Sequence, residues 1–268
     1  DWVHKLPLLG PHDLTWGAGI RVTTDDVEGT QFATFLPKRR TDPTYSLFAQ
    51  DRIDLWDSRV FLTLGTKLEH NNYTGLEYQP SARLTWLVTD KQTLWAATSR
   101  AVRVPARLNE DLSLFAPVPF TPPLYVNVEG NDDFDSEKLF SIEAGWRVAF
   151  TEALSGDLAL YHNDYRRLLS QELRGGISLV PGPRPYLLLP AVQLNRNEGE
   201  VYGGTAELRW QPVRMWRLDF QVSAIEFDLD RSPGGTDVNG LTVEGNSPDV
   251  QAALYSWLSL PYGVSVYT

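Results

Sequence analysis

Three arginines are spaced so that they can meet an anion where a predicted strand runs into a long connection. Arg100, Arg103 and Arg107 follow one another closely in the sequence. A guanidinium group binds a carboxylate, a phosphate or an anionic metal chelate through parallel hydrogen bonds. We expect Arg100 to share the inward face of its strand with Thr98 and Ala96. The alternative is that these arginines form ion pairs within the sheet itself.

Two long connections carry aromatic and basic side chains that suit a first contact with a ligand. Aromatic rings and guanidinium groups bind organic molecules by stacking and by hydrogen bonding. Packing of the loops on one another is the alternative role. The candidate ligand-binding residues are therefore Arg100, Arg103, Arg107, Phe115 and Tyr125 in or before the first connection, and Arg174, Arg184 and Tyr186 in the second.

Support for catalysis or for a metal centre is weak. The chain has no cysteine, which excludes a thiol nucleophile and a zinc–thiolate site. The acidic segment 131–137 has Ser136 and Ile142 where an EF-hand calcium loop needs glycine and glutamate. The four histidines are scattered along the chain, and only His162, with Asp164 two residues later, could form a pair for proton transfer. We therefore predict no enzyme, no cofactor and no metal site, with a looser calcium site in the segment 131–137 as the alternative to a solvated loop.

Composition narrows the class of protein. The 268 residues include 24 basic and 34 acidic side chains, for a net charge of −10, which argues against a nucleic-acid partner. No apolar run approaches the ~18 residues of a membrane helix. Two classes remain: a soluble all-β protein, or a membrane β-barrel, whose strands cross lipid without any apolar run.

Alternation with a period of two recurs along the chain and predicts an all-β, antiparallel protein. In 216–223 every even-numbered residue is apolar and every odd-numbered residue is polar or charged. Charges on the second face can form ladders between neighbouring strands; these are Glu143, Arg147, Glu207, Arg209, Arg217 and Asp219. The expected strands lie near 12–24, 44–54, 59–70, 77–88, 92–103, 138–150, 155–168, 191–211, 214–228 and 247–260, with an eleventh beginning at 263.

The predicted connections alternate between short and long. The short ones are 55–58, 89–91, 151–154, 212–213 and 261–262, with 5–12 as a further candidate. The long ones are 25–43, 71–76, 104–137, 169–190 and 229–246. A meander with short turns at one end and long loops at the other is typical of outer-membrane barrels.

The tryptophans favour the membrane interpretation over a soluble sandwich. All nine lie in or near the predicted short connections, whereas core tryptophans would scatter along the strands. Indole prefers the headgroup layer of a bilayer. The predicted membrane-interface girdle consists of Trp16, Trp56, Trp86, Trp95, Trp146, Trp210, Trp216 and Trp257.

The strand count predicts an incomplete barrel. Bacterial single-chain barrels use an even number of strands, and closure requires the first and last strands to pair. About 10–11 strands, the last of them unfinished, do not meet that condition. We therefore expect residues 1–268 to form a single segment of a larger transmembrane β-barrel.

Several segments, taken in order, resemble the TonB-dependent outer-membrane receptors. SRAVRVP at 99–105 resembles that family's SRAFRxP, and EGNDDFDSEKL at 129–139 resembles GNPxLxxEKL. EAGWR at 143–147 is similar to ELGYR, YHNDY at 161–165 to FYNDY, and EGEVYGGTAE at 198–207 to xGxxYGxExE. Asp132 and Asp133 depart from the Pro-x of the family pattern, and this puts the local turn in question.

The resemblance implies a barrel of about 22 strands around an N-terminal plug, with the plug and the other strands absent from these residues. It implies import of a scarce nutrient, first a ferric siderophore and otherwise cobalamin, driven by the inner-membrane TonB complex. The expected partners are the chelate, the plug, TonB, the bilayer and the lipopolysaccharide of a Gram-negative outer membrane. A passive porin, an outer-membrane enzyme using His162 and a soluble β-protein remain as alternatives.

Overall fold

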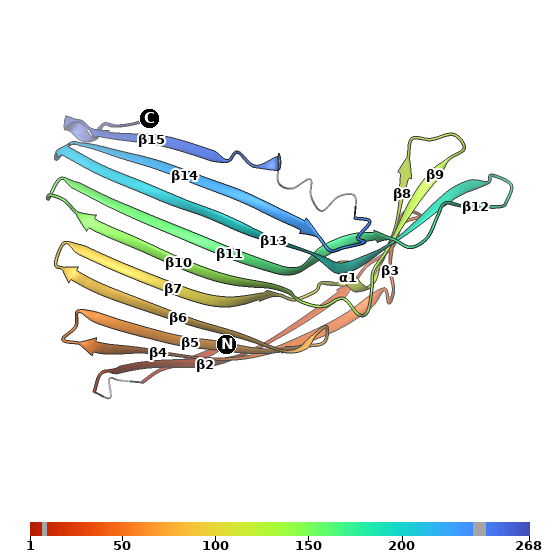
Figure 1. Ribbon diagram of the computed structural model, residues 1–268, viewed down its shortest axis with the longest axis horizontal. Helices are drawn as coiled ribbons and strands as arrows, with labels where there is room; N and C mark the ends of the chain where they lie inside the picture. The colour runs from red at the N-terminus through yellow and green to blue at the C-terminus, as the bar shows by residue number, and fades with distance from the viewer. Residues whose placement is uncertain (7–9, 238–244) are drawn as a thin grey trace.

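The computed structural model describes residues 1–6, 10–237 and 245–268. Within them, sixteen strands belong to one sheet, whose long strands lie side by side in chain order and form a curved wall (Figure 1). Each strand of the wall pairs antiparallel with the next. In pairing order they are β1 (Trp2–Lys5), β2 (His12–Asp26), β4 (Arg39–Trp56), β5 (Val60–Asn71), β6 (Gly75–Thr89), β7 (Gln92–Arg103), β10 (Glu137–Ala149), β11 (Leu154–Leu173), β13 (Tyr186–Val213), β14 (Trp216–Arg231), β15 (Val250–Ser259) and β16 (Ser265–Tyr267).

The wall confirms the strands expected from the two-residue alternation. Each of the ten predicted strands is present, and several extend further toward the long connections, most of all β4, β11 and β13. In the described residues β1 and β16 stand at the two edges of the sheet and do not pair with each other. No helix among those residues combines the length and the apolar character needed to cross a bilayer.

Three predicted loops contain regular structure of their own. They hold β3 (Ala33–Phe35), helix α1 (Arg107–Glu110), β8 (Leu112–Val118), β9 (Leu124–Glu129) and β12 (Ser178–Val180). Strand β9 runs parallel to the first residues of β13, from Leu124 opposite Leu187 to Glu129 opposite Val192. We call β3, β8, β9, β12 and that part of β13 the loop sheet; it projects beyond one end of the wall (Figure 1).

One predicted long connection is in fact a tight turn. Only residues 72–74 separate β5 from β6. The Asn71 side-chain oxygen accepts hydrogen bonds from the backbone N–H groups of Tyr73 and Thr74, both at 2.9 Å, and Gly75 has a φ of +72°, which glycine adopts without strain. The predicted connections 5–12 and 229–246 lie partly outside the described residues.

Strand register assigns every side chain of the wall to one of two faces. The apolar face includes, in direct register from β6 to β14, Leu84, Ala96, Ala144, Leu160, Gly204 and Ala224. The polar face carries the expected charge ladders. Arg147 pairs with Asp157 at 2.6 Å, and Arg209 pairs with Asp219 at 3.2 Å across neighbouring strands.

Packing is concentrated at the loop end of the wall. Buried apolar side chains of the loop sheet and its surroundings include Leu112, Val128, Phe134, Ala191 and Val192. By contrast, Ile142 and Leu160 on the apolar face are 51% and 55% exposed. An exposed apolar surface of this extent needs a lipid or protein partner.

Candidate functional site at the loop end of the wall

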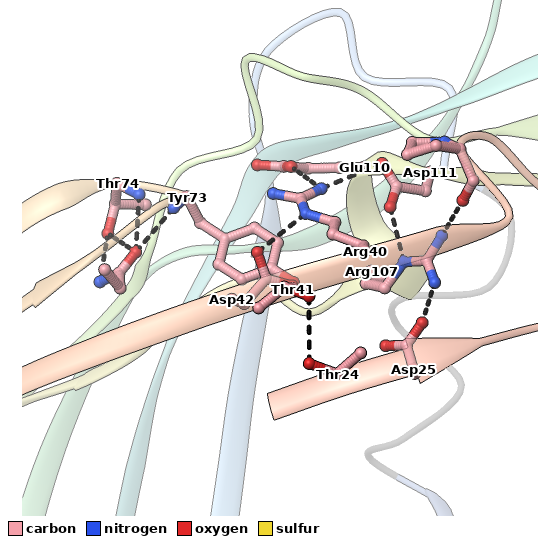
Figure 2. Close-up of polar contacts among 12 residues, drawn as sticks. Thr24, Asp25, Arg40, Thr41, Asp42, Tyr73, Thr74, Arg107, Glu110 and Asp111 are labelled. Atoms are coloured by element: carbon pink, nitrogen blue, oxygen red, sulfur yellow. Dashed lines mark hydrogen bonds and ion pairs between the residues drawn. The ribbon is translucent and has the colours of Figure 1, made fainter. Parts of the chain in front are cut away.

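Helix α1 is attached to strand β4 by the guanidinium group of Arg40. Its Nη1 lies 2.8 Å from Glu110 Oε2 and 3.0 Å from Asp111 Oδ1, and its Nε lies 2.9 Å from Asp42 Oδ1 (Figure 2). These side chains come from two loops that are distant in the sequence. The ion pairs therefore hold the connection 104–137 against the connection 25–43.

Arg107 makes a second attachment between the same loops. Its side chain is buried, and its Nε lies 2.7 Å from Asp111 Oδ2. Its Nη1 donates to Asp25 on β2 (Figure 2). Its Nη2 donates to the backbone carbonyl of Pro37. These contacts place Arg107 between the two loops; the ligand-binding role expected for it from the sequence stays a prediction.

Tyr73, in the turn between β5 and β6, extends the network. Its hydroxyl donates to Asp42 Oδ2 at 2.9 Å, and the guanidinium of Arg40 lies 4.4 Å from the centre of its ring. Burial raises the pKa of Tyr73, and the hydrogen bond to Asp42 raises it further. The phenol therefore stays protonated and remains a donor. We call the whole set the loop clamp; its members are Asp25, Arg40, Asp42, Tyr73, Arg107, Glu110 and Asp111.

The electrostatics of the loop clamp fit a structural role. Burial tends to lower the pKa of Arg40, but its hydrogen bonds to Glu110, Asp42 and Asp111 outweigh that tendency, and the pKa is raised. Burial raises the pKa of Glu110, against the opposing effect of Arg40. Two guanidinium groups share four carboxylates here. An anionic ligand would be repelled by that excess of negative charge.

The opposite side of α1 is fastened to strand β13. Asn109, only 2% exposed, donates from Nδ2 to Gln193 Oε1 at 2.9 Å, and Gln193 Nε2 donates to the Leu108 carbonyl at 3.1 Å. Further along β13, the side chain of Asn195 exchanges two hydrogen bonds with the backbone of Asp135. Together with the pairing of β9 and β13, these contacts join the connections 25–43, 104–137 and 169–190 into one packed unit.

Three of the predicted ligand-binding residues meet in an aromatic pocket. Phe115, Tyr125 and Tyr186 line a pocket of about 340 Å³ together with Gln31 and Phe32. The rings of Tyr125 and Tyr186 meet edge to face, with centres 5.3 Å apart. Phe32 is held beside β8 because its carbonyl accepts the Phe115 N–H at 2.7 Å. We call these five residues the aromatic pocket. Nothing in the sequence pattern singled out Gln31 or Phe32.

The three clustered arginines do not form one site, and the face predicted for Arg100 is wrong. Arg100, Thr98 and Ala96 do share a face, but Arg100 is opposite Phe140 and Thr98 is opposite Ile142, so that face is the apolar one. Arg103 lies on the polar face and pairs with Glu137 at 2.8 Å.

Arg103 borders a second, larger hollow on the polar face. This pocket, of about 640 Å³, is lined in part by Tyr161, Asn163, Tyr165 and Phe227. Its aromatic rings and amide groups are the mixture found where organic molecules bind. The remaining candidates, Arg174 and Arg184, are exposed near the tip formed by β12, and neither makes an ion pair within the part of the chain that the structure describes.

Six of the eight tryptophans of the predicted girdle lie on the apolar face near the short turns; these are Trp16, Trp56, Trp86, Trp146, Trp210 and Trp216. Trp95 and Trp257 are on the polar face instead. The guanidinium of Arg83 lies 4.3 Å from the ring centre of Trp95, and that of Arg217 lies 4.2 Å from Trp257. Position along the chain could not reveal this, because both tryptophans sit close to short turns.

Comparison with known proteins agrees with this architecture. The family model for the TonB dependent receptor-like β-barrel matches residues 2–267. The ferric enterobactin receptor of Pseudomonas aeruginosa is 27% identical over 159 residues, which cover 56% of this chain and 21% of that protein. The iron-regulated outer membrane virulence protein of Vibrio cholerae is 24% identical over 203 residues, covering 75% of this chain and 30% of its own length.

Solved structures share the fold. The siderophore receptor PirA from Pseudomonas aeruginosa has a TM-score of 0.70 at 17% identity, covering 99% of this chain and 47% of that one. The FrpB iron transporter from Neisseria meningitidis has a TM-score of 0.68 at 10% identity, covering 99% and 40%. The chain spans less than half the length of each of these relatives. With a family match over nearly every residue, an antiparallel wall and a folded loop end, the chain belongs to the TonB-dependent receptor family, within its β-barrel region.

Proposed function

We propose that this chain is a segment of the barrel of an outer-membrane receptor that captures a ferric siderophore and imports it with energy from the TonB system. The plug and the remaining strands of that receptor would lie outside these 268 residues. The observation that carries the proposal is the aromatic pocket, which three separate loops build at one end of the wall.

The aromatic pocket suits a flat organic chelator. Phe115 and Tyr125 come from the β8–β9 hairpin, Tyr186 begins β13, and Phe32 precedes β3. Aromatic rings in edge-to-face and stacked arrangements bind other rings favourably. The loop clamp and the loop sheet hold these side chains before any ligand arrives, which lowers the entropy cost of binding. The exposed guanidinium groups of Arg174 and Arg184 would attract an anionic chelate to the same end.

The two faces of the wall support a transmembrane location. The apolar face exposes its large side chains and carries the six tryptophans toward the short turns, as expected where lipid replaces water. The polar face bears paired charges and the pocket beside Arg103. In the proposed receptor the polar face would contact the plug and the passing chelate. The residues described here would form part of the barrel wall and, through the loop sheet, part of its opening.

Uptake by the full-length receptor tests the proposal, with ferric enterobactin as the probe because the ferric enterobactin receptor is a relative. We expect iron uptake that requires TonB, and binding about tenfold weaker in Tyr125→Ala. Tyr125→Phe should retain most of the binding because it keeps the ring. The matched control is Phe120→Ala, an exposed aromatic residue outside the aromatic pocket. Iron uptake that continues without TonB would instead indicate a passive pore.

If Tyr125→Ala and Phe120→Ala bind the probe equally well, the aromatic pocket is not the capture site. Failure of the wild-type receptor to bind ferric enterobactin, together with binding of cobalamin, would replace the siderophore with that nutrient.

A further inference from the structure

The polar face of the wall contains an apolar hollow close to its loop end. This is the pocket of about 640 Å³ beside Arg103, and its volume is in the range of small-molecule sites. Its two sides are formed by Tyr161, Asn163 and Tyr165 of β11 and by Ile225, Phe227 and Leu229 of β14. Further from the loops the same face carries Thr205 opposite Ser223 and then Glu207 opposite Gln221. The apolar lining is therefore local to the hollow.

The floor of the hollow is formed by β13, where two glycines flank a buried valine. Gly199, Val201 and Gly203 alternate along the polar face of this strand. A side chain at Gly203 would collide with the ring of Tyr161, and one at Gly199 would collide with Leu229. Val201 is only 5% exposed and lines the hollow. The missing side chains let the two neighbouring strands bring their apolar groups together around Val201.

Asn197 adds a hydrogen-bond acceptor to this lining. Its side chain is only 6% exposed, and its Nδ2 donates to the Leu169 carbonyl at 3.0 Å and to Asp237 Oδ2 at 2.6 Å. The two hydrogen bonds fix the orientation of the amide. Its Oδ1 accepts no hydrogen bond within the part of the chain that the structure describes. A buried acceptor without a donor is destabilising, so an N–H group on an occupant of the hollow would stabilise the site.

The charges around the hollow disfavour an anionic occupant. Glu137 is engaged at both oxygens, Oε2 by Arg103 Nη1 at 2.8 Å and Oε1 by the Leu169 N–H at 3.0 Å. Glu198 and Asp237 add two further carboxylates to the lining. One guanidinium group beside three carboxylates leaves an excess of negative charge, which repels an anion. The hollow therefore suits an uncharged apolar group that carries a hydrogen-bond donor.

We propose that the receptor takes ferric chelates that bear an apolar arm, such as an acyl chain joined through an amide, and that this hollow binds the arm. Val201, Ile225 and Phe227 contact the hydrocarbon, whose burial removes apolar surface from water. Asn197 Oδ1 accepts the amide N–H. The anionic iron centre stays outside the hollow. The inference rests on the proposed function, in which the polar face contacts the passing chelate, and it narrows the substrate to amphiphilic chelates.

Binding of matched ferric chelates to the purified full-length receptor tests the proposal. Two linear tripeptides that each bear three catechol groups differ only in an octanoyl or an acetyl group on the terminal amine, and calorimetry measures each Kd. We expect the octanoyl chelate to bind at least about tenfold more tightly, because each fully buried methylene strengthens binding about fourfold. An octanoyl ester, which lacks the N–H, should bind about fivefold more weakly than the amide.

Variants of the hollow locate the site of the arm. Phe227→Ala and Val201→Thr should each reduce the octanoyl gain at least about threefold and leave the affinity for the acetyl chelate unchanged. The matched control is Phe220→Ala, on the same strand but on the apolar face opposite Leu208, and it should keep the full gain. Comparing the two chelates in each variant cancels partitioning of the acyl chain into detergent. Heat-modifiable gel mobility verifies that each variant is folded.

Equal affinity of the wild type for the octanoyl and acetyl chelates would overturn the proposal; this is the result expected if side chains of the plug fill the hollow instead. An octanoyl gain that persists in both Phe227→Ala and Val201→Thr would also overturn it, because the arm would then bind elsewhere. Equal binding of the amide and the ester would contradict the part assigned to Asn197.

The proposed function can fail separately from this inference. Uptake of ferric enterobactin that requires TonB, without any octanoyl gain, would contradict only the binding of an apolar arm. Failure of the receptor to bind any of the ferric chelates would contradict both.

Discussion

Arg40 in β4 and Glu110 in α1 are 70 residues apart in the chain and are joined by a 2.8 Å ion pair. Both side chains are mostly buried. The pair connects two loops that would otherwise extend separately from the wall, and it supports the loop sheet that carries the aromatic pocket. The loop end of the wall is therefore held by these ion pairs as well as by its buried apolar side chains.

Replacing Arg40 by alanine should release α1 and the β8–β9 hairpin. Removing one member of a buried ion pair leaves its partners uncompensated, and we expect the local free energy of opening to fall by about 3 kcal/mol. Hydrogen exchange in 107–118 should then accelerate about a hundredfold. Arg39→Ala is the matched control, since Arg39 is the exposed neighbour of Arg40 on the same strand. Equal exchange in the two variants would show that the loop clamp does not hold the loop end of the wall.

The contribution of Glu110 should depend on pH. Its folded pKa is raised, chiefly by burial, above the ordinary value of 4.5. A carboxyl group whose folded pKa is raised binds its proton more tightly in the folded loop, so its contribution is greatest below the unfolded pKa and falls as pH rises through the folded one.

We therefore expect the stability difference between wild type and Glu110→Gln to shift against the wild type as pH rises above about 4.5. Hydrogen exchange of the loop, corrected for the intrinsic pH dependence of amide exchange, measures this difference. A difference that stays constant across that range would mean that Glu110 titrates alike in the open and closed loop.

Gly145 on β10 should not tolerate a larger residue. A Cβ atom at this position would lie 2.4 Å from the ring of Trp95 on the neighbouring strand, so the ring would have to leave the guanidinium of Arg83. We expect Gly145→Ala to lower the free energy of unfolding by about 1–3 kcal/mol, measured by urea titration of the folded receptor. Gly176→Ala is the control, because no atom lies within 4 Å of its Cβ; equal losses would exclude the packing explanation.

The assignment of the tryptophans to two faces can be tested with brominated lipids, which quench only indoles near the acyl chains. In full-length receptor reconstituted into such lipids, Trp86→Phe should remove part of the quenched fluorescence, and Trp95→Phe should remove only unquenched fluorescence. The reverse result would contradict the strand register between β6, β7 and β10.

The long strands were predictable because each is specified locally by alternating apolar and polar residues. The face of Arg100 was not, since 94–100 contains small residues such as Ala96 and Thr98 that suit either side; only pairing with Phe140 and Ile142 decides it. The aromatic residues Phe115, Tyr125 and Tyr186 were identified by type and by place in the predicted loops.

Contacts between loops carried no signal in the sequence. Phe32 belongs to the aromatic pocket and Arg40 to the loop clamp through partners far away in the chain. No spacing rule connects residue 40 with residue 110. The loop strands β8 and β9 were missed for a related reason: the segment is interrupted by prolines, and β9 pairs with the distant β13 as well as with its neighbour β8.

Strand β13 runs from Tyr186 in the aromatic pocket to Val213 beside the short turns. A single continuous strand therefore joins the aromatic pocket to the short-turn end of the wall. Its neighbour β11 is not regular throughout, because the register shifts between Tyr165 and Ser170 and Arg167 has a φ of +59°. We expect the loop sheet to move as one unit relative to the wall, with the change in backbone conformation confined to this irregular stretch of β11.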